Sequence, residues 1–219
     1  GVLKHLTHLE ELVLTSKKQG LDIAIEFLKE LYETLKGKAE SKTFVSVKFD
    51  GAPAVITGIN PENKQFFVST KSLANVNPKI NYTEEDIDKN HGHAPGLAQK
   101  LKLALKYFPS VISDGIYQGD FMFDQQDLKQ QTIDGEDLIL FKPNTITYAV
   151  LQHSPLGQRI TNSKVGVVFH TKYAGNNLKS LSKSSDVNVS EFNQSQDVFV
   201  DDAKFKDIAG VATFTKDES

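Results

Sequence analysis

The feature that most constrains this chain is a series of short β-type segments that follow one another without regular alternation with helices. These segments alternate apolar and polar residues, or are rich in β-branched and aromatic side chains, as strands are. They lie at residues 44–49, 54–59, 65–70, 115–123, 138–142, 145–152 and 164–173. Helical spacing of apolar residues occurs at 21–35 and 97–108. We therefore expect an α+β fold, with largely antiparallel sheets and flanking helices.

The remaining stretches predict irregular structure. Residues 75–95 contain two Pro and several Asn, residues 178–196 are rich in Ser and Asn, and Asp134-Gly135-Glu136-Asp137 is typical of a turn. Residues 197–214 predict one more strand and a short turn of helix. We expect a single domain over 1–219, with a helical N-terminal element (1–40), a motif-bearing core (41–175) and an irregular C-terminal segment (176–219).

Composition narrows the function classes. The 219 residues contain no Cys, which excludes disulfides, thiolate catalysis and cysteine-based zinc sites. The net charge of −3 lacks the basic surplus of a protein that holds nucleic acid mainly by its phosphates. The chain has no run of about 18 apolar residues, and its opening GVLKHLTHLEELVL has no signal-peptide pattern. We expect no membrane partner and a cytoplasmic location.

The most specific motif is VKFDGAPA at residues 47–54. Lys48 ends an alternating strand, Asp50 lies on the same face if the strand continues, and Gly51 permits a sharp turn or close approach to a ligand. A lysine amine attacks phosphorus only when it is neutral, and its ordinary pKa is about 10.4. Burial or a nearby cation lowers that pKa and activates the amine. The alternative reading is a solvated lysine before an ordinary Asp-Gly turn.

This motif resembles motif I of the covalent nucleotidyltransferase superfamily, which comprises ATP-dependent DNA ligases, RNA ligases and mRNA capping enzymes. The shared pattern is Lys-x-Asp-Gly, and its lysine becomes nucleotidylated. The resemblance implies that Lys48 is the nucleophile, that Asp50 is catalytic and that Gly51 contacts the nucleotide. It covers about residues 44–173 and implies antiparallel sheets that form a nucleotide-binding cleft, as in a ligase adenylation domain.

Three further segments resemble family motifs in the same order. STKS at residues 69–72 implies a phosphate or nucleotide contact by Lys71. YQGDFMF at 117–123 resembles the Gly-Glu strand motif and implies that Asp120, in place of Glu, binds the ribose or a metal ion. TYAV at 147–150 falls where the family has a base-stacking aromatic, which implies that role for Tyr148, although core packing explains it equally well.

The last matches depart from the family pattern. KVGVVFHTKY at 164–173 resembles the Glu-Gly-Val-Val strand, with Val165 in place of the metal-associated Glu. Strand alternation predicts that His170 and Lys172 share one face and bind phosphate. Lys204-Phe205-Lys206 has the form of the final Lys-x-Lys strand of the family, but Lys172 is the preferred substitute because the spacing is long.

The resemblance implies a ligase-like enzyme that uses ATP and Mg²⁺. AMP would form a lysyl adduct and then pass to the 5′-phosphate of DNA or RNA. The alternatives are a GTP-using guanylyltransferase of the capping type, and a nucleotide-binding module of the same fold without catalysis, for which Val165 would be the sign. The strings HLTHLEELVL, VKFDGAPA and GVVFHTKY also resemble an uncharacterised family from large marine tailed phages. A phage source would imply the host cytoplasm.

Overall fold

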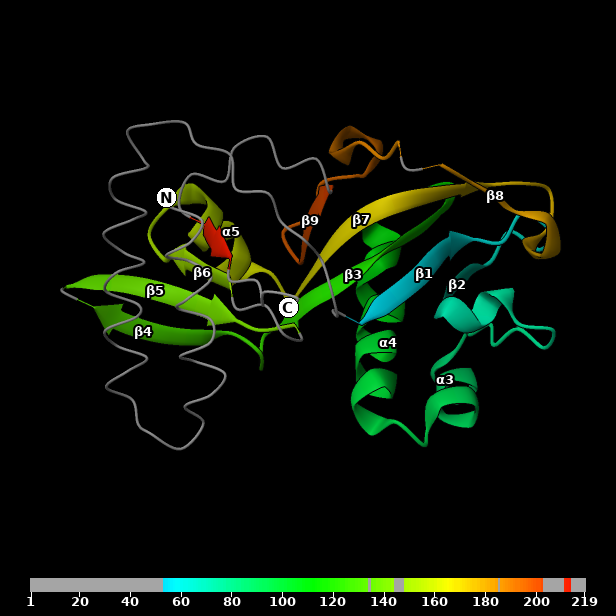
Figure 1. The fold of residues 1–219 in the computed structure, drawn as a ribbon, viewed down its shortest axis with the longest axis horizontal. Coiled ribbons are helices and arrows are strands. Elements are labelled where there is room, and N and C mark those ends of the chain that lie inside the picture. The colour runs from blue at the N-terminus through cyan, green and yellow to red at the C-terminus, as the bar shows by residue number, and fades with distance from the viewer. Residues whose placement is uncertain (1–52, 134, 144–147, 185, 203–210, 214–219) are drawn as a thin grey trace, which may run out of the picture. The chain divides into compact units, whose positions relative to one another are not determined.

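A computed structural model describes residues 53–133, 135–143, 148–184, 186–202 and 211–213 (Figure 1). The expected helix at 21–35, the expected strand at 44–49, the Lys48-Phe49-Asp50-Gly51 motif and Lys204-Phe205-Lys206 lie outside these residues. The chain divides into two compact units. Unit 1 comprises Gly1–Gly51, Gln126–Thr161 and Phe205–Ser219, and unit 2 comprises Ala52–Gln125 and Asn162–Lys204.

Unit 2 contains a sheet of six described strands. These are β1 (Ala54–Ile59), β2 (Phe66–Ser69), β3 (Ile116–Asp124), β7 (Val165–Ala174), β8 (Ser182–Ser184) and β9 (Val198–Asp202). The strand order is β2-β1-β3-β7-β8, and β9 also pairs with β7. Only the β7–β9 pair in this described sheet is parallel, so the expectation of an α+β fold with mostly antiparallel pairing is confirmed.

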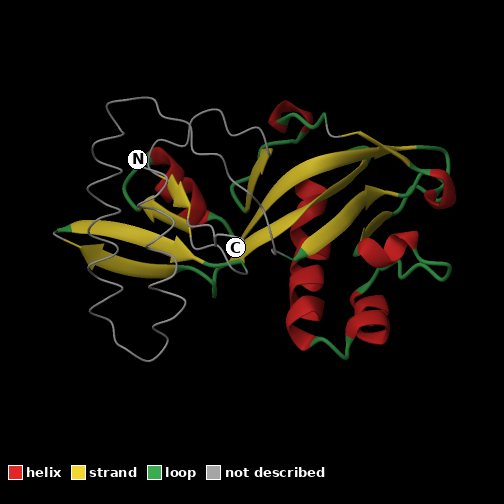
Figure 2. Cartoon of the chain, viewed as in Figure 1, coloured by secondary structure: helices red, strands yellow, loops and turns green. Residues whose placement is uncertain are grey.

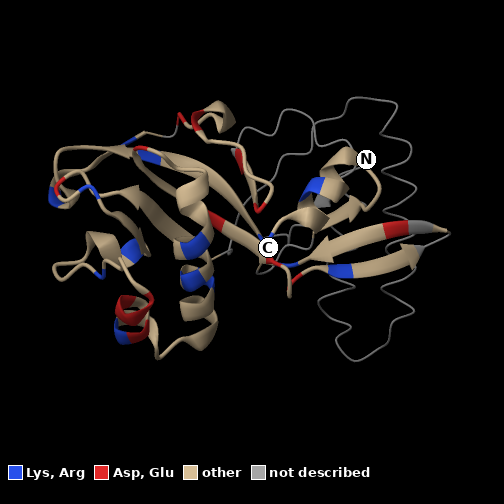
Figure 3. Cartoon of the chain, turned by 180° about the vertical axis from the view of Figure 1, so that it is seen from behind, with Lys and Arg blue, Asp and Glu red and all other residues tan. Residues whose placement is uncertain are grey.

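Two α-helices, α3 (Glu84–His91) and α4 (Pro95–Tyr107), lie between β2 and β3 in the sequence. The apolar spacing at 97–108 predicted α4. The irregular stretch expected at 75–95 is wrong in part, because α3 begins there with a capping box in which Thr83 and Asp86 each accept a backbone N–H bond. Acidic and basic residues both lie on α3, and basic residues lie along α4 (Figure 3).

The main core lies between α4 and one face of the sheet (Figure 2). Ala98, Leu101 and Ala104 of α4 are buried there, at the i, i+3, i+6 spacing of one helix face. They join apolar side chains from β1, β2, β3, β7 and β9. Phe169 is fully buried and stacks on Phe192, with ring centroids 4.8 Å apart. These contacts hold α4 against one face of the sheet, and the opposite face packs against a different set of residues.

The segment after β7 is more ordered than the sequence predicted. It contains the 3₁₀ turns Leu178–Ser180 and Val189–Glu191 in addition to β8. Val187 and Phe192 are buried in the main core, so the irregular segment expected at 178–196 is wrong in part. The additional strand expected within 197–214 is confirmed by β9. Two more 3₁₀ turns, Lys71–Ala74 and Phe108–Ser110, follow β2 and α4.

Unit 1 contains a second antiparallel sheet. Its described strands are β4 (Lys129–Ile133), β5 (Glu136–Phe141), β6 (Tyr148–Leu151) and β10 (Val211–Thr213), in the order β10-β6-β5-β4, and its helix is α5 (Pro155–Asn162). The turn expected at 134–137 is confirmed in position, since Ile133 pairs with Glu136 and Gly135 has a φ of 81°. Among the described helices of both units, none has the length and apolar character that crossing a membrane requires.

Candidate functional site

The sheet face opposite α4 changes from apolar to charged across three rows of paired residues. In the first row Ile116 pairs with Tyr173, and in the second Gln118 pairs with Thr171. In the third row Asp120 pairs with Ala54 on β1. The apolar end is covered by a small cluster of Ile56, Phe67, Leu73 and Ile116. The charged end is therefore where a polar ligand would find partners on this face.

Asp120 and His170 come together at the charged end. The His170 Nε2 lies 3.9 Å from the Asp120 Oδ1, which is too long for a hydrogen bond. The Asp120 side chain is only 8% exposed, whereas the His170 side chain is 30% exposed. Lys71 opens the 3₁₀ turn after β2 and is close enough for its charge to act on His170. Asp120 and His170, which two separate motifs indicated, thus lie near each other, and the charge of Lys71 reaches His170.

A β-bulge determines which way His170 faces. Gly119 pairs with Phe169 and Gln118 with Thr171, so His170 is an extra residue in β7. Such a residue shifts the alternation of side chains beyond it. His170 therefore lies on the Asp120 face, where its Nδ1 is 2.7 Å from the Thr171 hydroxyl, but Lys172 lies on the opposite face. The expectation that His170 and Lys172 form a basic pair on one face is wrong.

The imidazole of His170 is held towards its neutral form. Burial lowers the pKa of His170 below its ordinary value, and the positive charge of Lys71 lowers it further. Burial and the charge of Lys71 thus both favour the uncharged imidazole of His170.

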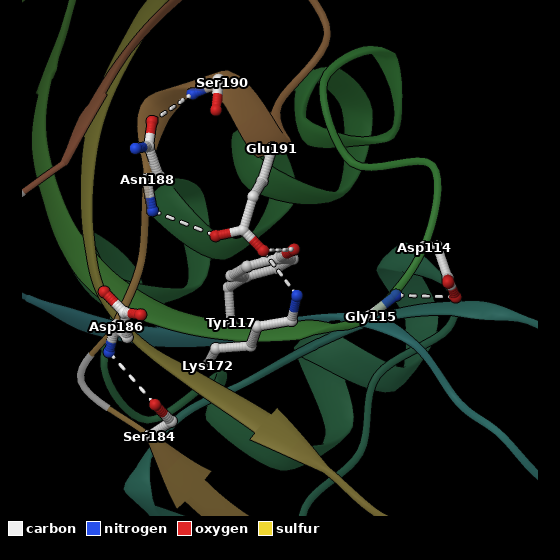
Figure 4. A network of polar contacts seen from close by, with 9 residues as sticks. All are labelled: Asp114, Gly115, Tyr117, Lys172, Ser184, Asp186, Asn188, Ser190 and Glu191. Carbon is white, nitrogen blue, oxygen red and sulfur yellow. Dashed lines mark hydrogen bonds and ion pairs between the residues drawn. The ribbon is translucent and has the colours of Figure 1, made fainter.

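Lys172 belongs to a separate network that attaches the 186–193 segment to the sheet (Figure 4). Its ammonium group donates to Glu191 and lies 5.6 Å from the centre of the Tyr117 ring. The Tyr117 hydroxyl also donates to Glu191, at 3.4 Å, and the backbone N–H of Asn188 donates to the second carboxylate oxygen at 3.0 Å. The hydrogen bond to Glu191 raises the pKa of Lys172, and the network gives Lys172 a structural role on the core side of the sheet.

Tyr148 lies in β6 of unit 1. It is 4% exposed, and its ring stacks on Phe141 with an interplanar angle of 5° and a centroid distance of 5.1 Å. The two residues are paired across β5 and β6. This packing accounts for the burial of the ring, and a base-stacking role for Tyr148 stays a prediction.

Val165 is fully buried in the core beneath α4. The position that carries the metal-associated Glu in the resembling family is thus an apolar core position in this chain. In the described residues no group of three or more His, Cys, Asp or Glu side chains is arranged to hold a metal ion. Among the described residues, Asp120 is the carboxylate for which the motif resemblance implies binding of a metal ion or the ribose.

The motifs did not indicate Gln118 and Tyr173, which lie on the same face. The Tyr173 hydroxyl donates to the Gln118 Oε1 at 2.6 Å. Gln118 is the half-buried residue of β3, whereas its eight neighbours in the strand are buried. The available signal for Gln118 was a polar side chain in the middle of a mostly apolar strand segment.

The fold and site thus define an α+β protein in which a mostly antiparallel sheet presents the carboxyl group of Asp120 and the imidazole of His170 on one face. The chain belongs to DUF6267, a family of unknown function, whose model matches residues 3–219. No curated protein and no solved structure matches it.

Proposed function

We propose that this protein is an ATP-dependent, ligase-like nucleotidyltransferase with Lys48 as the nucleophile. The observation that carries the proposal is the approach of His170 to Asp120 on one sheet face, where the charge of Lys71 also acts on His170. They come from three separate motifs that resemble those of covalent nucleotidyltransferases, in the same order along the chain. Grouping of this kind is expected if the three motifs serve one ligand.

The position of β1 supports the assignment of Lys48. Pro53 follows Lys48 by five positions, a stretch of chain that spans at most about 17 Å when extended. The Pro53 carbonyl accepts a hydrogen bond of 2.9 Å from the backbone N–H of Phe121, and Ala54 pairs with Asp120. The chain that leaves the Lys48 motif therefore enters the sheet beside Asp120.

The described residues fit a nucleotide that carries its own Mg²⁺. Mg²⁺ in such sites takes one or two protein carboxylates and completes its shell with phosphate oxygens and water. Asp120 supplies one carboxylate, or alternatively binds the ribose hydroxyls, and Lys71 and His170 face the phosphates. A bound metal ion would neutralise charge on the phosphates.

In the proposed reaction the neutral amine of Lys48 attacks the α-phosphorus of ATP. An N–P bond forms, the bond to the leaving pyrophosphate breaks and the amine loses a proton. Lys71 stabilises negative charge on the phosphates, since positioning and charge stabilisation supply most of the catalysis in phosphoryl transfer. The AMP is then passed to an acceptor, which we propose to be a 5′-phosphate of DNA or RNA in the cytoplasm. Use of GTP, as in capping enzymes, is the alternative nucleotide choice.

The second candidate is a nucleotide-binding module without catalysis, which the burial of Val165 in the apolar core favours. The two candidates differ in pyrophosphate release. A nucleotidyltransferase releases one pyrophosphate per site without an acceptor, because the lysyl adduct forms first, whereas a binding module releases none.

The test is to mix the purified protein with ATP or GTP and Mg²⁺ and to measure pyrophosphate. We expect one stoichiometric burst with ATP, and its loss in Lys48→Ala and Lys48→Arg, because a guanidinium group cannot supply a neutral amine. Lys179→Ala, which changes an exposed lysine, is the matched control and should keep the burst. A burst with GTP alone would favour the capping type, and nucleotide binding without any burst would favour the binding module.

A further inference from the structure

Gln118 is an unusual residue for its place in the fold. It lies at the centre of the sheet, paired with Ile56 on one side and Thr171 on the other. The other eight residues of β3 are buried, and Gln118 is half-buried. A polar amide in such a position is costly unless its oxygen and its NH₂ group both have partners.

Tyr173 is the hydrogen-bond partner of the Gln118 amide oxygen. The Tyr173 ring packs against the small apolar cluster at the end of the sheet face, and its hydroxyl donates to the Gln118 Oε1 at 2.6 Å. Burial raises the pKa of Tyr173, so the hydroxyl keeps its proton and remains a donor. The bond therefore fixes which end of the amide points towards Tyr173.

The NH₂ group of Gln118 then points away from Tyr173. For this group the described residues show no hydrogen-bond partner, and it is not among their buried atoms without a partner. The group is therefore in contact with solvent, with two N–H donors available and an orientation set by Tyr173. A donor that is oriented in advance binds an acceptor at a lower entropic cost.

The neighbours of Gln118 indicate which acceptor fits. Asp120 is two residues further along β3 on the same face, His170 lies beside Asp120, and the positive charge of Lys71 reaches His170. The face thus carries the Gln118 amide donor near Asp120 and His170, and the ammonium group of Lys71 is near enough for its charge to act on His170. Phosphate oxygens accept hydrogen bonds from both kinds of donor, and these bonds are strong because the oxygens are charged.

We propose that the Gln118 amide recognises a phosphate oxygen of the bound nucleotide and that Tyr173 is the positioning residue that orients it. This inference rests on the proposed function, because it assumes that the nucleotide binds on the Asp120 face. It adds a contact that the motif resemblances do not imply.

The experiment measures equilibrium binding of ATP and of inorganic tripolyphosphate to the Lys48→Ala protein, in which no adduct forms. We expect Gln118→Ala to weaken both ligands by about 10- to 100-fold, the effect of losing a hydrogen bond to a charged group. Tyr173→Phe keeps the ring and should weaken both by a smaller factor. Gln99→Ala, on the exposed part of α4, and Tyr107→Phe are the matched controls and should change neither affinity.

A double-mutant cycle separates positioning from a general effect on the fold. If Tyr173 acts through Gln118, Tyr173→Phe has no further effect on affinity in the Gln118→Ala background. Additive losses would overturn the role of Tyr173. Weakening of ATP with unchanged tripolyphosphate binding would overturn the phosphate contact, as would Gln118→Ala with full affinity for both ligands. If the wild type forms the lysyl adduct but the Gln118→Ala substitution leaves the affinity for both ligands unchanged, this inference is refuted and the proposed function stands.

Discussion

The buried imidazole of His91 predicts a loss of stability in acid. His91 is 3% exposed, and its Nε2 lies 3.1 Å from the Asn81 Nδ2. The Asn81 amide orientation is set by two other bonds, since its Nδ2 donates to the Val68 carbonyl and its Oδ1 accepts from Asn90, both at 2.9 Å. The amide nitrogen therefore faces His91, so the Nε2 must accept and the imidazole must be neutral.

The direction of the pH effect follows from the pKa of His91. Burial lowers this pKa below its ordinary value, and the charges of Lys79 and His93 lower it further. Because the pKa of His91 is lower in the folded state than in the unfolded state, the unfolded chain takes up the proton first as pH falls. The stability is therefore fully present above the ordinary pKa of about 6.5 and is lost as pH falls through the folded-state pKa. The loss grows by at most about 1.4 kcal/mol per pH unit.

The size of the effect follows from the hydrogen bond that protonation breaks. An imidazolium Nε2 cannot accept, so two donors then face each other at a buried position, which costs about 1–3 kcal/mol. For a chain of this size that corresponds to about 2–4 °C in melting temperature for each kcal/mol. Val68 and Asn81 also exchange two backbone hydrogen bonds, so the loss would loosen the loop between β2 and α3.

The assay is thermal unfolding of the wild type and of His91→Gln between about pH 7.5 and about pH 5. Glutamine offers an uncharged acceptor oxygen to Asn81, so the variant should lose less stability than the wild type as pH falls. His93→Gln, at an exposed position two residues further on, is the control and should keep most of the acid dependence. Equal acid slopes for the wild type and His91→Gln would refute the reasoning.

Three further predictions concern the sheet. Asp120→Asn should lower the pyrophosphate burst by about 100-fold or more while the melting temperature stays within a few degrees, and a fully active or unfolded variant would contradict a role in the site. Lys172→Met should leave the pyrophosphate burst unchanged and lower the free energy of unfolding by only about 0.5–1 kcal/mol, because the ion pair with Glu191 is partly exposed and screened by solvent. Loss of the burst would show instead that Lys172 acts in the site. Gly119→Ala should cost about 1–3 kcal/mol in urea unfolding, since its Cβ would lie 2.3 Å from the Val168 carbonyl oxygen, whereas Gly96→Ala, with nothing within 4 Å, should not destabilise.

The fold could be predicted where apolar periodicity is strong. Four of the six residues at 54–59 are β-branched, and β1 has those bounds. α3 was missed because the helix buries only Ile87 and His91, so its apolar stripe is too sparse to stand out between two prolines. β4 was missed because Lys129-Gln130-Gln131-Thr132-Ile133 has almost no apolar side chains, and its pairing with β5 is decided by tertiary contacts.

The site could be predicted in part, because motif order identifies residues but not the register of strands. Asp120 and His170 lie near each other on one face, and the charge of Lys71 acts on His170. Lys172 does not lie on that face, because one extra residue in β7 shifts the alternation, and a bulge is visible only when the partner strand is known. Gln118 was missed for the same reason, because the orientation of its amide depends on Tyr173, which lies in another strand.

The most direct test of the central claim is peptide mapping by mass spectrometry after incubation with ATP and Mg²⁺. We predict one added AMP on the peptide that contains Lys48, sensitive to acid as a phosphoramidate is, and absent from Lys48→Arg. Lys179→Ala should carry the same adduct on the same peptide. AMP on another residue, or an intact mass without any adduct over a range of Mg²⁺ and Mn²⁺ concentrations, would contradict the assignment of Lys48 as the nucleophile.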